Sequence, residues 1–240
     1  MKKTSSLQKK ISWSFWYGVG MALLEAVVVV YLRALYYPDG FSFPLETMDW
    51  SIYRIEILRE AGTLLMLACV SALAAESFTT WLAYFLFNFA VWDIFYYVWL
   101  KVLLNWPASF MEWDVLFLIP ITWDGPVLSP LLCTIAMLTL AAILLINHQH
   151  GKQVKLNGKE WALLAGGALL IFTSFIWNYT GLMLRGGYFM DLSNLGSSAD
   201  LLQASATFIP PSFQWPIFLA GYGLIWIGIW MLAVRLRKQA

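Results

Sequence analysis

Long apolar stretches alternate with short polar segments along the whole chain. Six stretches reach the roughly 20 residues that an α-helix needs to cross a bilayer, and they are 13–37, 57–76, 78–104, 126–147, 161–183 and 214–234. The third stretch is the longest, so we expect its helix to tilt or to extend beyond the lipid. The pattern predicts an all-α, polytopic integral membrane protein: a bundle of six transmembrane helices in a single domain over residues 1–240.

The first stretch is expected to be a permanent helix and not a cleavable signal peptide. Its apolar part is too long for a signal, contains Glu25 and lacks a small-residue cleavage site.

The overall composition supports a membrane environment. Hydrophobic residues make up 60% of the chain and charged residues 12%, and the mean hydropathy is +0.68. Soluble domains usually carry about 25% charged residues. The net charge of +1 says nothing about nucleic acid, but the sequence has no basic stripe or binding motif, so no nucleic-acid partner is expected. The bilayer is therefore the expected partner for most of the surface.

Basic residues gather in the segments before the first helix, between the fourth and fifth helices, and after the sixth. They are Lys2, Lys3, Lys9, Lys10, Lys152, Lys155, Lys159, Arg235, Arg237 and Lys238. Lysine and arginine mark cytoplasmic segments, and an even number of helices puts these three clusters on one side. We therefore expect an N-in/C-in protein of the cell membrane, with both termini cytoplasmic.

Three acidic residues lie inside the predicted helices at matching depth. With a rise of about 1.5 Å per residue, Glu25 lies roughly 20 Å from the cytoplasmic boundary, and Glu60 and Asp93 lie roughly 24 Å from it. All three therefore fall in the outer third of a hydrocarbon core of about 30 Å. Three consecutive helices are thus expected to bring a carboxylate to the same level.

Basic residues accompany these acids farther out along the same helices. Arg33 follows Glu25 by eight positions, Lys101 follows Asp93 by eight, and each pair shares a helix face. In the segment YRIEILREAGT, residues at helical spacing fall on one side of the predicted helix, and they are Glu56, Arg59, Glu60 and Thr63. Tyr97 lies between Asp93 and Lys101 on their shared face. The candidate binding residues are Glu25, Arg33, Glu56, Arg59, Glu60, Asp93, Tyr97 and Lys101.

Two interpretations of these charges stay open. Ionisable groups inside a membrane usually face the bundle interior or a wet cavity and often mark functional sites. Alternatively, they form interhelical ion pairs that fix packing, or they extend their ends to the membrane surface.

The expected outer loops add further candidates. Trp-Asp occurs three times, at Trp92-Asp93, Trp113-Asp114 and Trp123-Asp124. The last two lie in a segment too short to span, which is expected to be an interfacial or re-entrant element or part of an aromatic belt. Asp114, Asp124 and Arg185 are possible outer-loop contributors to the site, and loop 184–213 is either a lid or a connector.

The sequence offers no conventional metal or cofactor site. The two histidines, His148 and His150, follow the fourth stretch, so a haem held by histidines within the bundle is not expected. Cys69 and Cys133 sit in apolar runs without metal-ligand spacing. No metal is assigned and the cofactor is unknown.

Three classes of function follow from these residues. The first is a binding or transport protein with an outward-facing pocket for a cation or a small polar or zwitterionic ligand. The second is a membrane enzyme acting on a lipid or isoprenoid by carboxylate acid–base chemistry or through a hard cation such as Mg²⁺. The third is a non-catalytic subunit or assembly factor, in which the charges pair with a partner in an oligomer or membrane complex. Whether the protein is an enzyme is left open.

Overall fold

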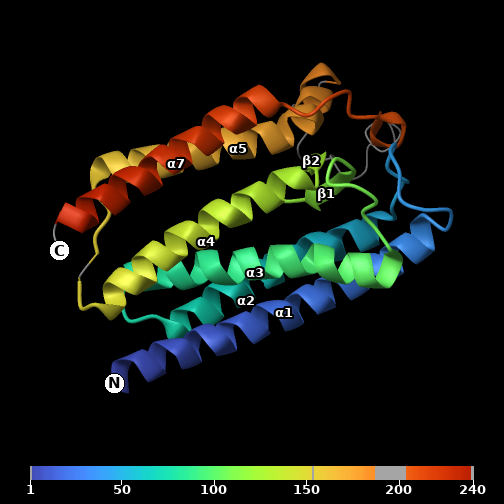
Figure 1. Ribbon diagram of the computed structural model, residues 1–240. Coiled ribbons are helices and arrows are strands. Elements are labelled where there is room, and N and C mark those ends of the chain that lie inside the picture. The colour runs from blue at the N-terminus through green and yellow to red at the C-terminus, as the bar shows by residue number, and fades with distance from the viewer. Residues whose placement is uncertain (1, 153, 187–203, 239–240) are drawn as a thin grey trace.

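The computed structural model describes residues 2–152, 154–186 and 204–238, and it is dominated by six long helices (Figure 1). They are α1 (Lys2–Tyr36), α2 (Trp50–Ala74), α3 (Phe78–Leu104), α4 (Leu128–Gln149), α5 (Gly158–Arg185) and α7 (Trp215–Lys238). All six are long and apolar enough to cross a membrane. The prediction of a multi-pass membrane protein is confirmed to that extent.

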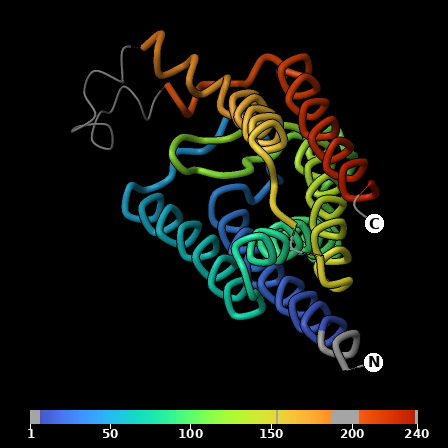
Figure 2. The backbone as a smooth tube through the Cα atoms, turned by 90° about the vertical axis from the view of Figure 1, so that its left-hand side faces the viewer, coloured from blue at the N-terminus to red at the C-terminus, as the bar shows by residue number. Residues whose placement is uncertain are grey.

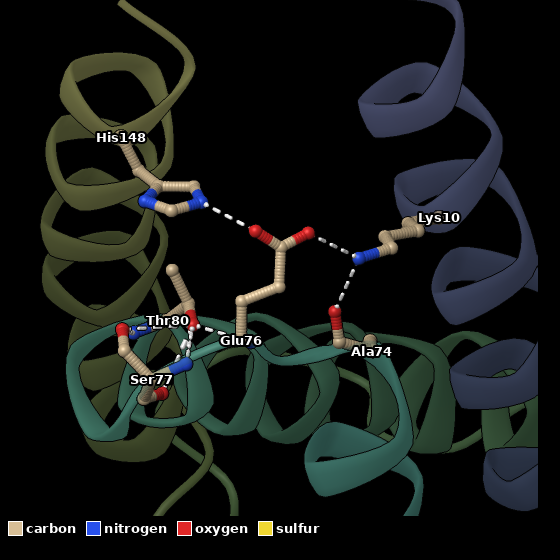
Figure 3. A network of polar contacts seen from close by, with 6 residues as sticks. All are labelled: Lys10, Ala74, Glu76, Ser77, Thr80 and His148. Carbon is tan, nitrogen blue, oxygen red and sulfur yellow. Dashed lines mark hydrogen bonds and ion pairs between the residues drawn. The ribbon is translucent and has the colours of Figure 1, made fainter. Parts of the chain in front are cut away.

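The helices run lengthwise in one bundle, and the two ends of the chain lie at the same end of it (Figure 1). We call this the termini end and the opposite one the hairpin end. At the termini end, Glu76 links α1 and α4 to the connection between α2 and α3, in which it lies (Figure 3). Glu76 accepts a hydrogen bond from Lys10 of α1 at 3.0 Å and lies 3.4 Å from His148 of α4. The Lys10 hydrogen bond holds the pKa of this exposed carboxyl below its usual value.

The helices pack as a curved row. Helix α3 packs against α1, α2 and α4, α4 contacts α7, and α7 packs against α5 along most of its length. The row therefore ends in α2 on one side and α5 on the other, and Figure 2 shows these two helices on opposite sides of the bundle.

The closest packing in the row joins α5 to α7 at two glycines. A Cβ atom built on Gly167 would lie 2.6 Å from the carbonyl oxygen of Gly221, and the reverse distance is also 2.6 Å. Only glycine fits on both sides of such a contact, as at other small-residue helix crossings in membranes. Helix α5 and helix α7 therefore behave as one packed pair.

Local capping explains where two of the helices begin. Ser77 and Thr80 form a reciprocal capping box at the start of α3, and Asn157 and Glu160 form another at the start of α5. Each box satisfies backbone N–H groups that a helix start leaves without partners. Both starts lie at the termini end, where the chain re-enters the bundle.

The segment between α3 and α4 forms a β-hairpin. Strands β1 (Trp113–Phe117) and β2 (Trp123–Pro126) pair antiparallel, with a register irregularity between Val115 and Phe117. The hairpin packs against α4 and α5, and Trp123 stacks on Phe175 of α5 with ring centroids 5.8 Å apart. The sequence predicted an interfacial or re-entrant element, or part of an aromatic belt, for this short apolar run. The structure forms a two-stranded element there, at the hairpin end.

Predicted and observed helix boundaries differ mainly at α1 and α2. Helix α1 begins at Lys2 and α2 at Trp50, whereas hydropathy predicted starts at 13 and 57. Hydropathy detects only the apolar part of a helix, and both helices continue into polar sequence beyond it.

Candidate functional site

Arg59 of α2 joins carboxylates from two helices. Its Nε donates to Glu56 Oε2 at 2.7 Å, and its Nη1 donates to Glu25 Oε1 on α1. The hydroxyl of Thr63 donates to the other Glu25 oxygen at 3.2 Å. The Glu25 and Glu56 side chains are only 11% and 7% exposed, so this is an ion-pair network sheltered between α1 and α2.

Glu60 follows Arg59 in sequence but turns to a different partner. Its two carboxylate oxygens accept from the backbone N–H of Leu118, at 3.1 and 2.9 Å. Leu118 lies between the two strands of the hairpin. Within the part of the chain that the structure describes, no basic side chain lies within 4.0 Å of this carboxylate. Glu60 therefore holds the hairpin to α2 without an ion-pair partner among the described residues.

Arg33 of α1 pairs with the hairpin. Its Nη2 lies 3.4 Å from Asp114 Oδ1, and the hydroxyl of Tyr97 donates to Asp114 Oδ2 at 3.3 Å. The Arg33 guanidinium also lies 4.5 Å from the ring centroid of Phe41 and 3.8 Å from that of Trp106. Burial raises the pKa of Asp114 to about 6, and the nearby Arg33 opposes that shift. Arg33 and Asp114 thus form a buried pair wrapped in aromatic rings.

Asp93 has a different environment from the other acids. Its Oδ2 atom is buried and has no hydrogen-bond partner among the described residues. The hydroxyl of Tyr97, which lies four positions after Asp93 on α3, donates to Asp114 and not to Asp93. Asp93 is therefore a buried carboxyl group with an uncommitted oxygen.

The three Trp-Asp dipeptides share one property that the sequence did not reveal. Asp93, Asp114 and Asp124 are 9%, 2% and 0% exposed, respectively. Asp124 accepts a hydrogen bond from Asn178 Nδ2 of α5 at 2.8 Å, and its Oδ1 has no partner in the described part of the chain. Burial raises the pKa of Asp124 to about 7, against the opposing effect of Asn178. Asp124 thus links the hairpin to α5, as Glu60 links it to α2.

Two of the predicted site residues lie apart from this group. The ammonium group of Lys101 is exposed and donates to the backbone carbonyls of Asn105 and Pro107 at 3.2 and 3.0 Å. Arg185 is exposed at the last position of α5. Neither residue lines the cavities described next.

Two cavities meet at the charged residues. The end cavity, of about 430 Å³, lies at the hairpin end and is lined by Arg33, Tyr37, Glu46, Tyr53, Glu56 and Asp114, among others. The central cavity, of about 440 Å³, includes Glu25 and Asp93 in a mostly apolar wall from α1, α2, α3, α4, α5, α7 and the hairpin. Residues lining both are Val29, Arg59, Glu60, Tyr96 and Val115. Glu25, Glu60 and Asp93 therefore face one common space.

The described residues contain no group of three or more histidine, cysteine, aspartate or glutamate side chains placed to hold a metal ion. His148 and His150 lie at the termini end of α4, away from the cavities. The chemistry available in the cavities is that of carboxyl, guanidinium and phenol groups in aromatic surroundings.

No protein-family model, no curated protein and no solved structure matches this chain. Its function therefore has to be inferred from the geometry of the two cavities.

Sequence reasoning missed several residues that complete the site. Asn178 lies within α5 and bonds to Asp124, and Tyr96 lines both cavities. A polar residue inside an apolar helix is a usable signal, which would have singled out Asn178. Tyr96 gave no such signal, because tyrosine is common in membrane helices for reasons unrelated to binding.

Proposed function

We propose that this protein is a membrane-embedded binding or transport protein whose end cavity receives a cation or a small zwitterionic molecule. The observation that carries the proposal is the balance of charge in that cavity. Its lining includes four carboxyl groups and two guanidinium groups, from Glu46, Glu56, Glu60, Asp114, Arg33 and Arg59.

The pairing of these groups leaves acid in excess. Arg33 is paired with Asp114, and Arg59 with Glu56 and Glu25. Glu60 accepts from a backbone N–H, and no basic side chain of the described residues lies within 4.0 Å of it. A positively charged group in the cavity would supply the missing charge, and intramembrane carboxylates commonly serve such roles.

Aromatic side chains strengthen this choice. Tyr37, Phe41, Trp50, Tyr53 and Tyr96 line the same cavity. The faces of aromatic rings attract cations, and cages of such rings recognise quaternary ammonium groups. A volume of about 430 Å³ also falls within the usual range of roughly 300–1,000 Å³ for ligand pockets.

We further propose that the termini end is cytoplasmic and that the end cavity faces outward across the cell membrane. The basic residues at the start of α1, around the connection between α4 and α5, and at the end of α7 all belong to the termini end, and lysine and arginine favour the cytoplasmic side. The test uses single cysteines at Asp39 and Lys155 in a chain with Cys69 and Cys133 replaced. An impermeant thiol reagent should label only the Asp39 variant in intact cells, and the opposite pattern would invert the orientation.

The binding proposal is tested by ligand-induced thermal stabilisation of the purified protein. Tetramethylammonium and glycine betaine are the probes, with sulfate as the anionic comparison. A ligand at 100 times its dissociation constant stabilises a protein by about 2.7 kcal/mol, which is readily measured. Wild type should be stabilised by the first two probes, and Glu60→Gln should lose the effect.

Asp39→Asn is the matched control, because Asp39 is an exposed acid at the same end of the bundle that lines neither cavity. It should keep the wild-type response. Equal stabilisation of wild type and Glu60→Gln, or no response to either cationic or zwitterionic probe, would overturn the proposal.

A second candidate, a membrane enzyme acting on a lipid, is favoured by Asp93. A buried carboxyl group with an uncommitted oxygen beside an apolar cavity is suited to general acid–base chemistry. In that case Asp93→Asn should retain ligand-induced stabilisation while losing turnover of the bound molecule.

A further inference from the structure

The wall of the central cavity is too apolar for the cavity to belong only to a small polar ligand. Beyond its charged residues, its wall includes Leu82, Leu86, Phe89, Leu164, Ala168 and Phe172. Leu82 precedes Asp93 by eleven positions on α3, which is about 16 Å along the helix. The apolar wall therefore extends from the charged residues through the middle of the bundle.

The position of the cavity in the row of helices gives it a side facing lipid. Its lining includes residues of α2 and of α5, the two helices that end the row (Figure 2). Ala165 and Ala168 of α5 both line the cavity and are exposed. Because these helices are apolar enough to span a bilayer, that exposed surface meets acyl chains.

The two cavities share lining residues and therefore lie side by side. Arg59, Glu60 and Tyr96 line the end cavity and the central cavity alike. A head group at this boundary would contact Glu60, and a chain attached to it would extend along α3, α4 and α5.

We infer that the ligand is an amphipathic molecule of the bilayer, with a cationic or zwitterionic head group at Glu60 and its apolar chain in the central cavity. This inference rests on the proposed function, whose head-group site it extends.

The expected source of affinity follows from the surroundings. A chain gains little by leaving lipid for the cavity, because lipid tails are as apolar as leucine side chains. Selectivity for one ligand over other lipids must therefore come from the head group, through the Glu60 carboxylate and the aromatic rings. The chain determines the direction from which the ligand enters.

The test uses two photoreactive amphiphiles with the same hexadecyl chain, which carries a diazirine at its end. One has a trimethylammonium head group and the other a sulfonate. The protein is placed in lipid nanodiscs, irradiated with each probe, and the labelled peptides are identified by mass spectrometry. The trimethylammonium probe should label cavity-lining positions of α3, α4 and α5 by about tenfold over the sulfonate probe, which corresponds to about 1.4 kcal/mol of selectivity.

A tryptophan at a cavity-lining alanine blocks the chain path. Ala168→Trp should reduce labelling of the cavity by the trimethylammonium probe to the sulfonate level, and Ala165→Trp provides a second blocking variant. Ala162→Trp is the matched control, because Ala162 is an exposed alanine of the same helix that does not line the cavity. Each variant should retain stabilisation by tetramethylammonium, which shows that it is folded and that the head-group site is intact.

The outcomes separate this inference from the proposed function. If the blocking variants leave labelling unchanged while tetramethylammonium still stabilises through Glu60, the chain site is refuted and the head-group site stands. If both probes label the cavity equally and Ala168→Trp blocks both, head-group selection is refuted, and the inferred ligand with it. If neither probe labels the cavity, the inference is overturned.

Discussion

Asp114 and Asp93 form a matched pair on which the electrostatic reasoning can be tested. Both are buried acids that follow a tryptophan, but only Asp114 is paired with a base, Arg33, at 3.4 Å. Replacing each by asparagine keeps the shape and removes the charge. We expect the two variants to differ sharply in stability because only one of them leaves a buried cation behind.

The magnitude follows from what surrounds Arg33. Breaking a buried ion pair by removing one partner typically costs about 3–5 kcal/mol. The Arg33 side chain is 9% exposed, and its guanidinium keeps contact with Phe41 and Trp106. Those rings compensate in part, so Asp114→Asn should lose about 3 kcal/mol of unfolding free energy, near the low end of that range.

Asp93→Asn should behave differently. Asp93 has a buried oxygen with no hydrogen-bond partner in the described part of the chain, so its replacement removes the cost of burying a carboxylate and leaves no base unpaired. Its unfolding free energy should lie within about 1 kcal/mol of wild type, with ligand binding or turnover affected instead.

The assay is unfolding by sodium dodecyl sulfate in mixed micelles, followed by tryptophan fluorescence. It compares wild type, Asp93→Asn, Asp114→Asn, Arg33→Met and Arg33→Met/Asp114→Asn. The double variant should be less destabilised than the sum of Asp114→Asn and Arg33→Met, because the pair interacts directly. Equal losses for Asp93→Asn and Asp114→Asn would refute the distinction drawn between a paired and an unpaired carboxyl group.

Three further predictions concern the scaffold, and the same titration measures each. Gly167→Ala should lower the free energy of unfolding by about 1–3 kcal/mol through overpacking, because its Cβ would lie 2.6 Å from the carbonyl oxygen of Gly221. Gly166→Ala should leave the free energy of unfolding unchanged, because a Cβ at Gly166 would have no neighbour within 4 Å. Equal effects of the two substitutions would contradict the close contact. Burial raises the pKa of Asp124 from 3.8 to about 7, so the folded state binds the extra proton and stability should fall as pH rises from about 4 to 7 by up to roughly 4 kcal/mol. Asp124→Asn should flatten that decline, and an unchanged pH profile would show that Asp124 is not its source. Asn157→Ala removes the N-cap of α5 and should lower the free energy of unfolding by about 1 kcal/mol. An unfolding midpoint equal to that of wild type would show that the cap does not stabilise the protein.

The helices could be predicted from the sequence because lipid offers no partners for backbone hydrogen bonds. A spanning segment must satisfy those groups internally, so it is an apolar helix of defined minimum length. The same criterion misplaced the start of α2, at Trp50 instead of 57, because Tyr53, Arg54 and Glu56 continue the helix without adding to its hydropathy.

The charge pairs could not be predicted in the same way. Spacing placed Arg33 and Glu25 on one face of α1, but Arg33 bonds to Asp114 of the hairpin and Glu25 to Arg59 of α2. Such pairs depend on the rotation of neighbouring helices and on how far the hairpin enters the bundle, and neither follows from periodicity along one helix. Spacing within a single helix placed Glu56 and Arg59 on one side of α2, and these two side chains are in contact.

The packing of α5 against α7, described above as a contact of two glycines, has a consequence for biosynthesis. Helices α1 to α4 each find a packed neighbour among themselves, whereas the main partner of α5 is α7, which follows it in the chain. Because chains fold from the N-terminus as they emerge, we expect the unit of α1 to α4 to form first and the pair of α5 and α7 to form afterwards. The central cavity takes its walls from both, so it is complete only when α7 has been inserted and the second unit has docked on the first.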